Sequence, residues 1–217
     1  SSIRDAKSDK IDAARLIEIA RIEEDEALPV FFDSRETLKK KRYESLLAML
    51  EHTRQQLNQS YNDALKALKS IDVNIDLECL QDCLNVLETA IDTLKTLLTD
   101  AASPFAKEIA EIKGISLFQA TILTNATAGR HFETRDQLIA FFGLDVRVRQ
   151  SGSWKGRGSL SKRGNPFYRK VLFQIGWSLH MHNPIYKEYY EAMRTREKHY
   201  FTCILATARK FLRHYFS

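Results

Sequence analysis

The 217-residue sequence has no run of about 18 apolar residues, which excludes a membrane-spanning helix. Its N-terminal region is charged throughout, so it has no signal-peptide pattern. The three cysteines, Cys79, Cys83 and Cys203, form neither a Cys-x-x-Cys pair nor an even-numbered set, which argues against a structural zinc site and a disulfide framework. We interpret them as small helical residues of a protein that works in the reducing cytoplasm.

Acidic residues are scarce in the second half of the chain. Residues 103–217 contain 19 Lys and Arg against 8 Asp and Glu, a net charge of +11. Residues 1–102 contain 14 Lys and Arg against 20 Asp and Glu, a net charge of −6. A mildly acidic half joined to a strongly basic half is typical of a protein that binds a polyanion. The net charge of +11 on residues 103–217 also disfavours a purely structural coiled-coil adaptor.

The sequence also lacks a convincing strand pattern, and helical spacing dominates its first half. Asp33 and Glu36 indicate a capping box at the start of a long helix that runs to about Ser70. A second helix then repeats apolar residues at alternating spacings of three and four: Leu77, Leu80, Leu84, Leu87, Ile91, Leu94 and Leu98. The short connection predicts an antiparallel hairpin of coiled-coil type. Its own partner arm or another protomer can close the apolar seam, and we favour an arm that also contributes to oligomerisation.

From Ser103-Pro104 onwards the expected helices are shorter. Cap signals and apolar spacing place them at about 104–112, 117–127, 134–142, 165–180, from 183, and at about 201–215. Residues 144–164 show no helical period. We therefore predict an all-α fold, with a long antiparallel coiled-coil hairpin joined to a compact helical domain.

Between two of these helices lies a basic loop rich in glycine and serine. The segment from Gly143 to Lys170 holds five of the eight glycines and one acid, Asp145, against eight cations: Arg147, Arg149, Lys155, Arg157, Lys162, Arg163, Arg169 and Lys170. Glycines allow close backbone approach, cations bind phosphates, and Trp154 offers a stacking face. The pattern favours nucleic-acid contact over a merely solvated loop, but residue types alone do not single out a catalytic serine.

The segment Ile112-Lys113-Gly114-Ile115-Ser116 precedes an apolar helix and partly matches a helix-hairpin-helix, whose turn offers backbone N–H groups to a DNA phosphate. The second glycine of that motif is Ser116 here. A plain interhelical turn explains the same residues equally well.

Near the N-terminus, Asp9 and Asp12 are three residues apart on one expected helix face. Two such carboxylates can share a divalent ion such as Mg²⁺. The residues alone favour a second interpretation, in which both acids cap the start of the helix and bind no metal.

Several segments resemble, in order and spacing, the DEDD-type transposases and invertases related to the pilin-gene invertase Piv. Lys7-Ser-Asp9-Lys-Ile-Asp12-Ala13 is similar to the family's K-[ST]-D-x-x-D-A segment. Arg149-Gln-Ser151-Gly through Ser161-Lys-Arg-Gly164-Asn is similar to its R-x-S-G…S-K-R-G-[ND] pattern. The further matching segments are 112–125, 137–145, 182–184 and 208–212.

The resemblance implies a RuvC-like domain, a coiled-coil arm and a C-terminal transposase domain that bears a catalytic serine. On this chain they correspond to a remnant at residues 1–30, an arm at 31–102 and a domain at 103–217. Asp9 and Asp12 become the last two Mg²⁺ ligands of the acidic set, and Ser151 becomes the serine that attacks a DNA phosphodiester. Arg149, Lys155 or Arg157 can neutralise the negative charge that develops on the oxygens of the phosphorane.

The resemblance also implies DNA as the substrate, a structured non-coding guide RNA as a second partner, and a dimer or tetramer joined through the coiled coil. We expect a cytoplasmic, nucleoid-associated bacterial protein with no membrane partner. The other acids of the set are expected upstream of residue 1, so we expect this chain to be inactive by itself. The alternative is a non-catalytic nucleic-acid-binding protein with an oligomerisation arm, which needs neither Ser151 nor the aspartates.

Overall fold

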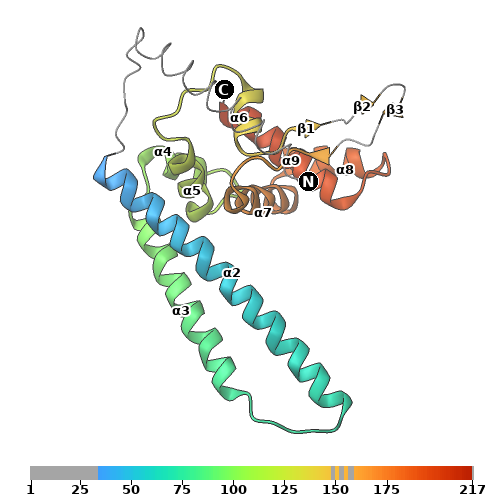
Figure 1. The fold of residues 1–217 in the computed structure, drawn as a ribbon. Coiled ribbons are helices and arrows are strands. Elements are labelled where there is room, and N and C mark those ends of the chain that lie inside the picture. The colour runs from blue at the N-terminus through green and yellow to red at the C-terminus, as the bar shows by residue number, and fades with distance from the viewer. Residues whose placement is uncertain (1–33, 148–149, 152–153, 156–158, 217) are drawn as a thin grey trace, which may run out of the picture. The chain divides into compact units, whose positions relative to one another are not determined.

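The computed structural model describes residues 34–147, 150–151, 154–155 and 159–216 (Figure 1). The chain forms two compact units, residues 1–36 and residues 37–217, and the second unit is described here. Helices make up most of it, which confirms the predicted all-α class. In the part of the chain that the structure describes, we find no helix with the length and apolar character needed to cross a membrane.

The predicted antiparallel hairpin is present as α2 (Arg35–Ser70) and α3 (Glu78–Asp100), which lie side by side in Figure 1. The α3 seam is buried at Leu84, Ile91, Leu94 and Leu98. The Arg54 guanidinium lies 2.7 Å from the Glu88 carboxylate and joins the two helices outside the seam. The hairpin therefore closes much of its own apolar seam, and a role of the arm in oligomerisation stays a prediction.

The base of the arm belongs to the same hydrophobic core as the helices that follow. Leu47 of α2 is fully buried, and it clusters with Ile91 and Leu98 of α3 and with residues of the C-terminal helices. Glu44, one turn earlier, is the only carboxylate among the buried residues that the structure describes. The arm and the C-terminal helices are consequently packed together at this point.

Among the described residues, the rest of the unit contains six helices: α4 (Pro104–Ala110), α5 (Leu117–Thr127), α6 (Arg135–Phe141), α7 (Pro166–His182), α8 (Pro184–Arg194) and α9 (Tyr200–Phe216). At the starts of five of these helices a side chain accepts a backbone N–H: Ser103, Ser116, Thr134, Asn165 and Asn183. These caps satisfy donors that a helix start otherwise leaves unpaired, which explains why the helices begin there.

Helix α7 is central, because it packs against α5, α8 and α9. Its contact with α9 is close at Gly176, where an added Cβ would lie 2.5 Å from the Ile204 carbonyl oxygen. Ile175 and Leu179, on the buried side of α7, are fully enclosed. A glycine at 176 thus allows two helix backbones to approach within a distance that any side chain would prevent.

The buried Glu44 carboxylate joins three helices. It accepts hydrogen bonds from the Asn125 amide of α5 at 3.1 Å and from the Tyr168 hydroxyl of α7 at 2.8 Å. Burial raises the pKa of Glu44 above its ordinary value of 4.5, and the hydrogen bonds from Tyr168 and Asn125 offset this rise only in part.

Replacement of Glu44 by Gln should make the stability of the unit less dependent on pH. The folded wild-type protein binds the Glu44 proton more tightly than the unfolded chain does, so its free energy of unfolding should fall, relative to that of Glu44→Gln, as pH rises above 4.5. Urea unfolding of both proteins from about pH 5 to about pH 8 measures this difference. A difference that stays constant across that range would contradict the assignment. Glu44→Ala, which leaves two polar groups unpaired, should lower stability by roughly 1–3 kcal/mol.

Candidate nucleic-acid interface

The basic Gly/Ser segment forms a narrow hairpin with short strands. Strand β1 (Val146–Arg147) pairs antiparallel with β4 (Ser159–Leu160), and β2 (Gln150–Ser151) pairs antiparallel with β3 (Trp154–Lys155). Along the chain, β2 and β3 lie between β1 and β4, so the two pairings are nested. No strand was predicted here, because two-residue strands are too short for an alternating sequence pattern to reveal.

Ser151 is the last residue of β2, and its backbone partner is Trp154. Val146 and Ser151 are five residue steps apart, which is at most about 18 Å of extended chain. Ser151 therefore belongs to the inner, distal pair of strands, and Val146 and Leu160 belong to the outer pair next to the helices. Ser151, the predicted nucleophile, therefore lies in the part of the segment that is most distant in sequence from the flanking helices α6 and α7.

The two ends of this segment meet through backbone contact between two glycines. Gly143 has a φ of +68°, and a Cβ added there would lie 2.6 Å from the Gly164 nitrogen. A Cβ on Gly164 would collide with the Phe141 carbonyl oxygen and would lie 2.5 Å from the Phe142 carbonyl carbon. Only residues without side chains allow the end of α6 and the approach to α7 to come this close.

Hydrogen bonds hold the base of the hairpin around these glycines. The Ser161 N–H donates to the Asp145 carbonyl at 2.9 Å, and the Ser161 hydroxyl donates to the Asp145 carboxylate. The Lys162 N–H donates to the Gly143 carbonyl at 3.3 Å. Leu144 is fully buried directly before Asp145. The hairpin thus starts from a fixed base.

The structure assigns a supporting position to two of the predicted nucleic-acid contacts. The Arg169 guanidinium donates to the Lys162 carbonyl at 3.1 Å and to the Gly164 carbonyl. The Lys170 ammonium lies 2.7 Å from the Glu51 carboxylate on the arm. Both cations are therefore engaged with the protein itself in this structure.

The structure describes the other predicted cations to different extents. Lys162 and Arg163 are exposed directly after β4, at the base of the hairpin. Arg147 and Lys155 lie in β1 and β3, where only the backbone is described. Arg149, Arg157, Asp9 and Asp12 lie outside the described residues. Lys162 and Arg163 are accordingly the two predicted cations that the structure places on an accessible surface next to the hairpin.

The turn at Lys113 and Gly114 lies at the other end of α7. Gly114 has a φ of +102°, and an added Cβ would lie 3.1 Å from the Ser178 carbonyl oxygen. Thirteen residues of helix separate Ser178 from Asn165 near the hairpin base, which is about 20 Å along the axis. The turn and the hairpin base therefore occupy separate positions, although Lys113 is exposed and available to a partner.

Ser116, at the position of the second glycine of a helix-hairpin-helix, caps α5 instead. Its hydroxyl accepts from the Gln119 N–H at 3.2 Å, and its own N–H donates to the Gln119 side-chain oxygen at 3.0 Å. The Ile115 N–H is likewise bonded to the Ile112 carbonyl at 3.0 Å. In a helix-hairpin-helix, backbone N–H groups of the turn bind a DNA phosphate. Here the Ile115 and Ser116 N–H groups are bonded within the protein, so this turn does not offer them to a phosphate.

No group of three or more metal-ligating side chains occurs among the described residues. The predicted Mg²⁺ site depends on Asp9 and Asp12, which lie outside them. Mg²⁺ binding by this chain therefore stays a prediction.

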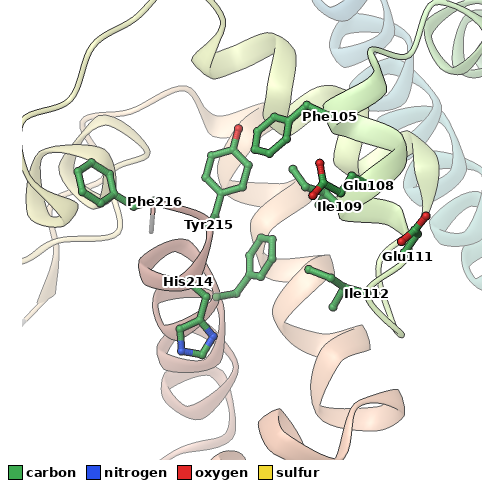
Figure 2. Close-up of a pocket in the computed structure, with 9 residues that line it drawn as sticks. Phe105, Glu108, Ile109, Glu111, Ile112, His214, Tyr215 and Phe216 are labelled. Atoms are coloured by element: carbon green, nitrogen blue, oxygen red, sulfur yellow. The ribbon is translucent and has the colours of Figure 1, made fainter.

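Figure 2 shows a pocket of about 690 Å³ between α4 and α9, with the side chains of Phe105, Ile109, Ile112 and Tyr215 around it. The Phe105 and Tyr215 ring centroids are 5.7 Å apart. Two acids, Glu108 and Glu111, and the side chains of Phe211, His214 and Phe216 also line it. The negative charge of the two acids disfavours phosphate, so this pocket is not part of the polyanion-binding surface.

A smaller hollow of about 300 Å³ lies beside the start of β1, lined in part by Asp136, Asp145, Arg209 and Arg213. Arg209 of α9 donates to the Leu144 carbonyl at 3.5 Å, and burial lowers the pKa of its guanidinium. Two acids balance the two arginines. These residues were not predicted as part of a site. The four-residue spacing of Arg209 and Arg213 is the one sequence signal that could have indicated that they share a helix face.

Comparison with known proteins places this geometry in context. Residues 106–191, which include the hairpin and its base, match the model of the transposase IS116/IS110/IS902 family. A Sinorhizobium fredii (strain NBRC 101917 / NGR234) protein named "Putative transposase y4rJ" is 35% identical over 85 residues, which is 39% of this chain and 22% of that protein. The chain therefore matches only about a fifth of that relative's length. These findings support a transposase-type domain between α4 and α8.

Gly164→Ala should destabilise the unit, because its methyl group would collide with backbone atoms of residues 141 and 142. We expect a loss of roughly 3 kcal/mol in the free energy of unfolding, measured by chemical denaturation. Gly129→Ala is the matched control: Gly129 has a φ of +68° but no atom within 4 Å of an added Cβ, so only backbone strain of about 1 kcal/mol applies. Equal losses in the two variants would show that the glycine contact at the hairpin base does not constrain the fold.

Proposed function

We propose that this chain supplies the serine-bearing part of a DNA transposase or site-specific recombinase. The observation that carries the proposal is the hairpin of residues 146–160, fixed at its base and located within the segment that matches the transposase family model. The basic charge of residues 103–217 and the exposed Lys162 and Arg163 support a nucleic-acid substrate. Family-model similarity alone supports a transposase in general, and the serine chemistry is our own proposal.

In the proposed reaction, the Ser151 oxygen attacks a phosphorus atom of the DNA backbone. A bond forms between the serine oxygen and phosphorus while the bond from phosphorus to one sugar oxygen breaks. The serine proton leaves to a base, and the departing sugar oxygen gains a proton. Rejoining reverses these events with a different sugar hydroxyl, so no oxidant or external energy source is needed. Arg149, Lys155 or Arg157, close to Ser151 in the sequence, would stabilise the negative charge on the phosphate oxygens.

Asp9 and Asp12 would contribute to a site for Mg²⁺. When bound, this ion would stabilise negative charge on the phosphate oxygens. The arm formed by α2 and α3 would help to join protomers, and a structured guide RNA would bind the basic surface in addition to DNA. The test uses the longest protein that the gene encodes.

Ser151→Ala should abolish strand cleavage and rejoining by that longest protein and leave its affinity for DNA unchanged within about twofold, because one hydroxyl contributes little to a charge-dominated complex. The measurement is a cleavage assay that traps the covalent protein–DNA adduct and maps it by mass spectrometry. Ser153→Ala is the control and should retain activity. Normal recombination by Ser151→Ala would rule out the nucleophile and favour a nucleic-acid-binding protein without catalysis.

Lys162 and Arg163, the exposed cations at the base of the β-hairpin, should contribute to DNA binding, whereas Lys170, which is already paired, should not. Lys162→Gln combined with Arg163→Gln should reduce the slope of log affinity against log salt concentration by about 2, since two phosphate contacts are lost. Lys170→Gln should change the slope little, because its ammonium is paired with Glu51. Fluorescence anisotropy with a labelled duplex at several salt concentrations measures both. The reverse pattern would place the binding surface on the arm side of α7.

A further inference from the structure

Helix α7 carries a row of large apolar side chains that are exposed or half-buried. Phe173, Trp177 and Met181 follow one another at spacings of four, which places them on one helix face. Trp177 is 45% exposed and Met181 is 55% exposed. Exposure of a tryptophan next to other apolar residues marks an interaction surface more often than a solvated one.

Residues at the start of α9 extend this row. The Phe201 ring, 55% exposed, lies 5.7 Å from the Phe173 ring between centroids. The His199 ring stacks on Phe201 at 5.6 Å with an angle of 18° between the ring planes. We call Phe173, Trp177, His199 and Phe201 the aromatic platform.

The platform has a firm support beneath it. His180, which is buried, lies edge-on to Trp177 at 6.2 Å and packs on Tyr190 at 4.3 Å. Tyr190 in turn contacts Tyr200 at 6.4 Å. These rings come from α7, α8 and α9, so a chain of ring contacts that starts at Trp177 links three helices.

The turn that leads into the platform is basic. Arg194 donates to the Lys198 carbonyl at 2.7 Å and thereby shapes the turn. Arg196, Lys198 and His199 are exposed, and Glu197 is the one acid among residues 194–199. Positive charge beside exposed rings complements a ligand that carries both phosphates and flat apolar faces.

We propose that the aromatic platform binds an unpaired segment of nucleic acid, with bases stacked on Trp177 and Phe201 and phosphates held by Arg196 and Lys198. Aromatic side chains reach base faces only where the bases are not stacked within a duplex. Trp177 lies twelve residues after Asn165, about 18 Å along α7 from the hairpin base. The platform is thus a second contact, separate from Ser151, and the inference rests on the proposed nucleic-acid function of the chain.

A fluorescence titration tests the stacking directly. The chain has two tryptophans, so Trp154→Phe leaves Trp177 as the single tryptophan and keeps a ring at position 154. Addition of a single-stranded thymidine oligonucleotide should quench its emission, whereas addition of a duplex of equal length should leave the emission nearly unchanged.

Binding measurements with substituted chains separate stacking from general apolar contact. Trp177→Leu should weaken single-strand binding about tenfold, and Trp177→Phe should weaken it much less, because stacking needs a ring. Met181→Ala, in the same row but without a ring to remove, should remain within about twofold of wild type. Circular dichroism melting of each variant confirms that the fold is retained.

The outcomes distinguish the two proposals. Oligonucleotide binding that leaves Trp177 emission and the Trp177→Leu affinity unchanged would overturn the platform and leave the proposed function intact. No binding of any oligonucleotide to the wild-type chain would contradict both. If Trp177→Leu instead converts a dimer to a monomer in sedimentation, with unchanged oligonucleotide affinity, the face is an interface between copies and the proposal is wrong.

Discussion

The backbone contact between Gly143 and Gly164 is the constraint on which the candidate site depends. It brings the end of α6 and the approach to α7 within a distance that admits no side chain. Everything between these two residues must therefore leave and return at one point, which favours the nested pairing of β1 with β4 and β2 with β3. Arg169 and the pair of Asp145 with Ser161 then secure that point with hydrogen bonds.

Much of the fold follows from local signals in the sequence. Ser103, Thr134, Asn165 and Asn183 each satisfy unpaired N–H groups at a helix start, and helices begin at these positions in the structure. The α3 seam was also predictable, because its alternating spacing of three and four survives without interruption. Such features depend on neighbours within one or two turns, which the sequence displays directly.

Features that depend on distant residues were not predictable in the same way. Nothing near Glu44 in the sequence indicates that its partners are Asn125 and Tyr168, 81 and 124 residues away. Arg169 and Lys170 belong to the basic segment by sequence, but the structure bonds one to the loop itself and the other to Glu51. The selection of Ser151 came from the family resemblance, since its setting alone does not distinguish it from Ser153, Ser159 or Ser161.

The shared core at the base of the arm also has a mechanical consequence. The 23 residues of α3 form a rod about 35 Å long, and its root is buried with Leu47 against the C-terminal helices. A rod rooted in a close-packed core is not free to turn at its base. Glu44 also bonds the arm to α5 and α7, and α7 begins at the base of the β-hairpin, so one packed core supports both the arm and the segment that carries Ser151.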